Sequence, residues 1–100
     1  MRKYDKVVIK KSTKPKKKMM AVFSSSKNAR TRTIHFGASG YDDYTKTKDK
    51  EQKARYLERH RRNENWDDPF SAGALSRWIL WDRPSIQASV RAYRKRFNLK

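Results

Sequence analysis

Apolar and polar residues in the first third of the chain follow a pattern that predicts three short β-strands. Residues 4–10 and 30–36 alternate with a period of two, which is typical of strands that are buried on one face only. The apolar run at 19–23 lies between them, and Pro15 and the polar loop at 24–28 favour turns. Because the segments are short and consecutive, we expect an antiparallel sheet whose first two strands form a hairpin.

Beyond about residue 38 the pattern changes to the period of 3.6 that is typical of α-helices. Residues 47–62 are rich in good helix formers, but their apolar stripe is narrow, so this helix is mostly solvated or docks through charge. A second helix is expected to begin at Ser71, which is a typical N-cap residue, and a third near Pro84 or Ser85. The apolar stripe of the third helix consists of Ile86, Val90, Tyr93 and Phe97.

These patterns predict an α+β fold in which a small N-terminal three-stranded antiparallel sheet packs against three C-terminal helices. A length of 100 residues is compatible with a single small domain. It would consist of a basic β-rich segment at 1–37 and a helical segment at 38–100 that ends in a basic helix. The expected core consists of Val7, Ile9, Val22, Ile34, Phe36, Leu75, Trp78, Ile79, Ile86, Val90, Tyr93 and Phe97.

The formal net charge of +17 arises from 27 Lys and Arg residues against 10 Asp and Glu residues. Residues 1–34 carry +11, residues 35–70 are neutral, and residues 71–100 carry +6. Two positive ends around a neutral middle indicate a polyanion or an acidic surface as the partner. The candidate binding residues are Lys10, Lys11, Lys14, Lys16, Lys17, Lys18, Arg30, Arg32, Arg91, Arg94 and Lys95. The run from Lys14 to Lys18 also has the composition of a nuclear-localisation signal.

The sequence offers little chemistry beyond charge. It has no Cys, which excludes disulfides, thiolate zinc sites and cysteine catalysis. His35 and His60 are its only histidines, and the local sequence joins neither of them to a carboxylate or a serine. The pairs Asp42-Asp43 and Asp67-Asp68 are weak evidence for a cation site. We therefore expect no catalytic residue, metal site, cofactor or small-molecule substrate.

Aromatic residues could in principle stack on nucleobases. Trp78 and Trp81 lie in the apolar second helix, where packing in the core is the better interpretation. Tyr41 and Tyr44 flank Asp42 and Asp43, and these carboxylates argue against nucleic acid at that point. The sequence thus favours contacts with a partner through charge rather than through recognition of nucleobases.

Several segments resemble a known group of viral proteins. The similarity appears at Thr33–Gly37 and Asp43–Thr45, sharpens at Arg59–Trp66, and is strongest at Ala72–Trp81. Together these segments resemble a family of short, uncharacterised basic proteins encoded by large nucleocytoplasmic DNA viruses of algae and amoebae, the chlorovirus and mimivirus type. That family supplies no catalytic or ligand residues. The resemblance implies a giant-virus protein that is located in the virion, and in the host cytoplasm or nucleus during infection.

In that context we predict a non-catalytic virion structural protein, a minor capsid or scaffold component. Its basic surfaces would bridge larger capsid subunits, and one of them could instead face the inner membrane surface. The alternative is a basic nucleic-acid-binding protein with little sequence specificity, which would package or condense the genome or bind RNA through phosphates. The sequence leaves both hypotheses open.

Overall fold

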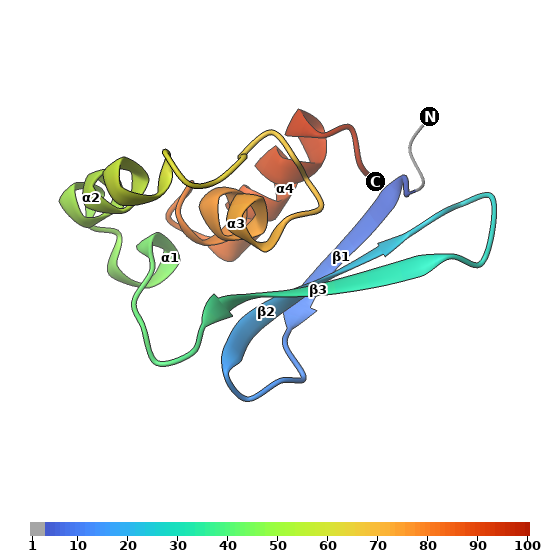
Figure 1. Ribbon diagram of the computed structural model, residues 1–100, viewed down its shortest axis with the longest axis horizontal. Coiled ribbons are helices and arrows are strands. Elements are labelled where there is room, and N and C mark those ends of the chain that lie inside the picture. Colours follow the sequence, from blue (N-terminus) through green and yellow to red (C-terminus); the bar gives the residue numbers. More distant parts are fainter. Residues whose placement is uncertain (1–3) are drawn as a thin grey trace.

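The computed structural model describes residues 4–100, and it has an N-terminal sheet followed by several helices (Figure 1). The sheet is antiparallel with the order β1-β2-β3, formed by β1 (Lys6–Lys11), β2 (Lys17–Ser24) and β3 (Thr31–Ala38). The helices are α1 (Tyr44–Thr47), α2 (Lys50–His60), α3 (Ala72–Leu75), the π-helical turn η1 (Ser76–Leu80) and α4 (Ile86–Arg96). The expected α+β class is confirmed. None of the helices within residues 4–100 combines the length and apolarity needed to cross a membrane.

The strand register separates a covered face of the sheet from an open one. Ala21 on β2 lies opposite Ile9 on one side and opposite Ile34 on the other. Side chains alternate along a strand, so Phe23 shares this face, and both Ala21 and Phe23 are fully buried. Val22 lies opposite Val8 on the other face, where Val8 is 51% exposed. The expectation that Val22 belongs to the core is therefore wrong, because Val22 cannot share a face with its neighbours in β2.

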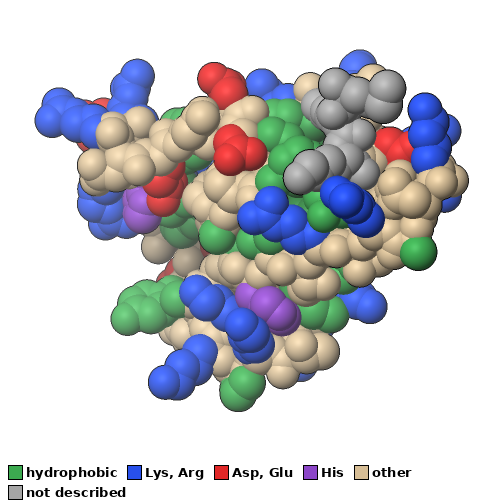
Figure 2. Space-filling model, turned by 45° about the vertical axis from the view of Figure 1, so that its right-hand side comes forward, with side chains coloured by type: hydrophobic (Ala, Val, Ile, Leu, Met, Phe, Trp, Pro, Cys, Tyr) green, Lys and Arg blue, Asp and Glu red, His purple; other side chains and the backbone are tan. Residues whose placement is uncertain are grey.

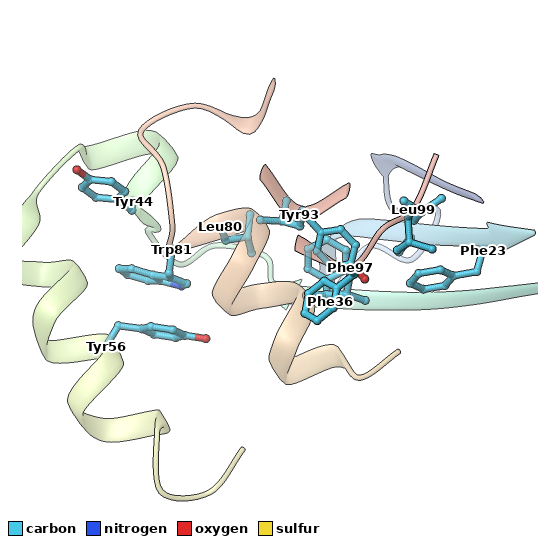
Figure 3. Packing of buried hydrophobic residues seen from close by; sticks show 13 residues of the cluster. Phe23, Phe36, Tyr44, Tyr56, Leu80, Trp81, Tyr93, Phe97 and Leu99 are labelled. Atoms are coloured by element: carbon cyan, nitrogen blue, oxygen red, sulfur yellow. The ribbon is translucent and has the colours of Figure 1, made fainter. Parts of the chain in front are cut away.

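The core lies between the covered face and the chain from α3 to α4 (Figures 1 and 3). Leu75, Ile79, Tyr93 and Phe97 are buried there as expected, and Phe36 meets them from the sheet. Partly buried residues packed around this cluster include Ile9, Ile34, Trp78, Ile86 and Val90. Trp81 is also buried in this cluster, in agreement with the interpretation of its ring as a core residue. The cluster further contains residues that we did not expect, namely Ala21, Phe23, Tyr44, Tyr56, Leu80 and Leu99.

Trp78 lies at the edge of the core rather than inside it. Two guanidinium groups lie over its indole ring, with the Cζ of Arg77 4.2 Å and the Cζ of Arg96 3.7 Å from the ring centroid. Its Nε1 donates a hydrogen bond of 2.8 Å to the carbonyl oxygen of Trp66. Trp78 therefore links η1 to α4 and to the preceding loop.

Side-chain caps decide where the helices begin. Ser71 and Ser85 accept hydrogen bonds from Ala74 N and Ala88 N, so the expected starts of two helices are confirmed. The helix expected at 47–62 is found as the shorter α2, and α1, which precedes it, was not expected. Lys48 ends α1 in the left-handed conformation with φ 55°, and Asp49 then caps α2. An N-cap Asp so close to the first helix starts a new one instead of extending it.

The C-terminal tail closes part of the outer edge of β1. Val7 N donates to Lys100 O and Lys100 N donates to Asp5 O, both at 2.9 Å. Arg94 Nη2 donates to Val7 O at 2.9 Å. These bonds satisfy backbone groups that an edge strand would otherwise expose, and they hold α4 against the sheet.

An ion pair fixes the start of β2 to the loop before α1. Asp43 is only 2% exposed, and its Oδ2 lies 2.6 Å from Lys18 Nζ. Its Oδ1 accepts from Thr45 N at 2.9 Å and from the Thr45 hydroxyl, which caps α1. The carboxylate thus has a structural role, and the interpretation of Asp42-Asp43 as a cation site is not supported.

The first prediction concerns the covered face. We expect Phe23→Ala to lower the free energy of unfolding by about 3–5 kcal/mol, because the ring is fully buried among other aromatic rings. Val8→Ala on the open face should cost about 1 kcal/mol or less. Urea unfolding of both variants measures the difference, and equal losses would contradict the assignment of the two faces.

The second prediction concerns the ion pair. Asp43→Ala should destabilise the protein by about 3 kcal/mol, since it removes a helix cap and leaves the ammonium group of Lys18 without its counter-ion. The double variant Asp43→Ala with Lys18→Met should lose less free energy of unfolding than the sum of the losses in the two single variants. A double-mutant cycle by urea unfolding measures this coupling, and strict additivity would argue against the pair.

Candidate functional site

A lysine-rich hollow lies beside the β1–β2 turn. Its volume is about 860 Å³, and it is enclosed by this turn, the segment from Ser39 to Lys46 and the beginning of α4. Met19, Leu80 and Ile86 contribute apolar lining. Five lysines also line this lysine hollow, namely Lys11, Lys14, Lys17, Lys18 and Lys46. Among the described residues that line it, Asp43 supplies the only carboxylate, and this carboxylate already pairs with Lys18.

Backbone geometry and short hydrogen bonds position these lysines. Lys11 ends β1 and Lys17 begins β2, and the turn between them is closed by a bond from Lys17 N to Lys14 O. Ser39 ties this turn to the chain after β3, because its N donates to Lys16 O and its Oγ donates to Pro15 O at 2.8 Å. The basic run at 14–18 is therefore a turn held in place rather than an extended arm.

A second hollow of about 600 Å³ lies between α2, the α3–η1 segment and the end of β3. Tyr56 stacks on Trp81 with ring centroids 4.3 Å apart and an angle of 5°, and on His60 at 4.3 Å and 26°. Figure 3 shows the parallel rings of Tyr56 and Trp81. Arg55 and Arg59 also line this aromatic cleft. The cleft adjoins the lysine hollow, because residues such as Lys17 line both.

Both histidines have partners that the local sequence did not indicate. His60 Nδ1 lies 3.2 Å from Glu64 Oε2, and Glu64 Oε1 accepts a hydrogen bond from Trp66 Nε1 at 3.0 Å. His35 Nδ1 lies 2.7 Å from Ser12 Oγ, across the sheet. The structure thus gives each histidine a partner that the sequence analysis did not assign to it. The four-residue spacing of His60 and Glu64 was a usable signal, whereas the contact of Ser12 with His35 depends on the tertiary fold.

The His35–Ser12 contact lacks the third group of a Ser–His hydrolase. Ser12 Oγ accepts from Lys14 N at 2.9 Å, so its hydroxyl is available to donate to His35. Within residues 4–100 no carboxylate forms an ion pair with His35, although such a group usually orients the base. No cluster of three or more metal-ligating side chains occurs in this part of the chain either.

Electrostatics keep the Tyr56 hydroxyl neutral. Burial raises the pKa of Tyr56 well above its usual value, and the negative charge of Glu64 raises it further. No hydrogen bond links this hydroxyl to another residue in the described part of the chain. It remains available as a neutral hydrogen-bond donor.

The structure separates the predicted binding residues into groups. Lys11, Lys14 and Lys17 line the lysine hollow, and the exposed Lys16 lies in the same turn. Lys10 is exposed on β1 and, opposite Met20, lies on the open face of the sheet. Lys18 lines the hollow but is committed to Asp43, and its side chain is only 12% exposed.

The remaining candidates lie elsewhere. Arg30 and Arg32 are at the β2–β3 end of the sheet, opposite the β1–β2 turn. Arg91 and Lys95 are exposed on α4. Arg94 is partly buried and donates to Val7 O, so part of its guanidinium group is committed to β1.

Sequence reasoning missed Lys46, Arg55, Arg59 and His60, because residues 35–70 are neutral as a whole. The spacing of two of these residues in the sequence is a signal that could have been used. Arg55 and Arg59 are four residues apart and therefore lie on one side of α2. Figure 2 shows how widely Lys and Arg side chains are distributed over one face of the protein, with fewer Asp and Glu side chains among them.

Comparison with known proteins identifies a family but no activity. Residues 7–60, which span β1 from its second residue, β2, β3, α1 and α2, match the model of a family of unknown function, DUF5754. No curated protein and no solved structure shows significant similarity to the chain. Since the matched segment covers more than half of the sequence, the protein belongs to the family of unknown function DUF5754.

Proposed function

We propose that this protein is a non-catalytic binding protein that holds the phosphate backbone of nucleic acid in its lysine hollow, with little sequence preference. One observation carries the proposal: five lysines surround one hollow whose single carboxylate, among the described residues, is already paired with Lys18. The unneutralised ammonium groups favour an anionic partner.

The charge of the whole molecule supports the same partner. Within residues 4–100, the Lys and Arg side chains that pair with a carboxylate are Lys18, Arg77 and Arg83. Most of the +17 charge therefore acts outward and attracts a polyanion over a distance. Lysine behaves as a point charge and does not read base edges, so binding should follow charge and shape rather than sequence.

A role as a virion scaffold component is a second candidate. It is favoured by the open face of the sheet, where Val8 is 51% exposed and Val22 is only partly buried. A capsid subunit could cover this face while the lysine hollow contacts carboxylates or an inner membrane surface. In this role the protein would be located in the virion, and in the host cytoplasm or nucleus during infection, as the sequence analysis expects.

The third prediction tests the phosphate contact by salt dependence. If about four to six phosphates are neutralised, the affinity for a short DNA duplex should fall by roughly 10²–10³-fold between 50 and 200 mM salt, because binding releases counterions. Fluorescence anisotropy at several salt concentrations measures the slope. Tight binding that does not depend on salt, or no binding at low salt, would contradict the proposal.

A pair of matched variants locates the contact. The double change Lys14→Gln and Lys17→Gln should reduce the salt slope by about two. Arg30→Gln with Arg32→Gln removes the same charge from the opposite end of the sheet, which is about 20 Å away, and should change the slope less. Equal effects of the two variants would show that the hollow is not the binding site.

A further inference from the structure

We propose that the aromatic cleft takes up one unstacked nucleobase, so that the protein prefers single-stranded nucleic acid to a duplex. This inference rests on the proposed function, since the same strand would lie with its phosphates along the lysine hollow. The cleft has a volume of about 600 Å³, which is within the range of about 300–1,000 Å³ for small-molecule sites.

The platform for the base is a column of three rings. Trp81 and Tyr56 are buried, with 8% and 6% of their surface exposed, whereas the side chain of His60 is 39% exposed. Tyr56 covers one face of the imidazole, and Glu64 contacts its Nδ1 edge. A ligand would therefore meet the imidazole on the part of its surface that remains exposed. A planar base placed there would extend the column by one more ring.

The column is held in position before any ligand arrives. Glu64, which contacts His60, also accepts a hydrogen bond from Trp66 Nε1. Glu64 packs so closely on α3 that a Cβ atom at Gly73 would lie 3.0 Å from its Cδ. A platform fixed in this way loses little conformational entropy when a base stacks on it.

Polar groups of both signs line the cleft, and they suit the hydrogen-bonding edge of a base better than an apolar ligand. Of its carboxylates, Asp43 pairs with Lys18 and Glu64 contacts His60, whereas Asp42 is exposed. The Tyr56 hydroxyl points from α2 toward η1 (Figure 3) and has no partner in the described part of the chain. Arg55 and Arg59 line the same cleft and are exposed. Lys17 lines both hollows, so a backbone on the lysine hollow can place a neighbouring base in the cleft. In a duplex the bases are stacked inside the helix and cannot enter.

The fourth prediction compares an oligothymidine with an oligomer of the same length in which the central residues are abasic. Both oligomers carry the same backbone charge, so the ratio of their affinities reports base contacts alone. We expect the full-length wild-type protein to bind the oligothymidine about 5- to 100-fold more tightly, as one stacked base contributes that much. Fluorescence anisotropy at fixed salt measures both affinities.

Variants of His60, at the end of the column, test whether the ratio of the two affinities depends on the cleft. His60→Ala should bring the ratio close to one and leave the affinity for the abasic oligomer unchanged. His60→Phe keeps a stacking face and should preserve the preference. His35 lies on the open face of the sheet, away from the column, so His35→Ala should leave the ratio as in the wild type. Circular dichroism of each variant verifies the fold.

The outcomes distinguish this inference from the proposed function. If both oligomers bind tightly and equally, no base enters the cleft, although phosphate binding stands. If neither oligomer binds at low salt, both proposals fail. Displacement of the oligothymidine by polyglutamate at a lower concentration than by unlabelled oligothymidine would overturn both and point to an acidic protein partner.

Discussion

The structure depends on one constraint, which is that only one face of a three-stranded sheet is covered. Phe23 and Phe36 on this face meet Ile79, Tyr93 and Phe97, and the largest fully buried apolar side chains are among them. A chain of this size and charge has few apolar residues to spare for a second layer. Most of the charge therefore lies on the turns and on the outer surfaces of the helices, and these surfaces, together with the open face of the sheet, are left for a partner.

Rigid attachment of the basic turn gives this charge a defined place. The Lys18–Asp43 ion pair and the hydrogen bonds of Ser39 hold the β1–β2 turn against the chain before α1. Lysines on a mobile arm would have to be ordered when a partner binds, and this ordering costs conformational entropy. The lysines around the hollow are carried by a backbone that is already fixed, so a smaller loss of conformational entropy opposes their binding to phosphate.

Both hollows draw mainly on the segment that matches the family. The segment that matches the family, residues 7–60, supplies the lysines of the lysine hollow together with Arg55, Arg59 and the first two rings of the column. The third ring, Trp81, and the apolar cover of the sheet come from residues beyond it. The matched segment thus holds most of the charged groups, and the rest of the chain buries the sheet on which they are arranged.

The sequence by itself determined the three strands, their antiparallel order and the helix starts at Ser71 and Ser85, because periodicity and capping act between residues close in the chain. It did not determine which strand residues face the helices, as Val22 illustrates, or that Arg94 would donate a hydrogen bond to β1. Nor did it bring Lys17 close to Arg55 and Arg59, or Trp81 onto Tyr56. These contacts join residues far apart in the sequence, and only the packing of α2 and η1 beside the sheet decided them.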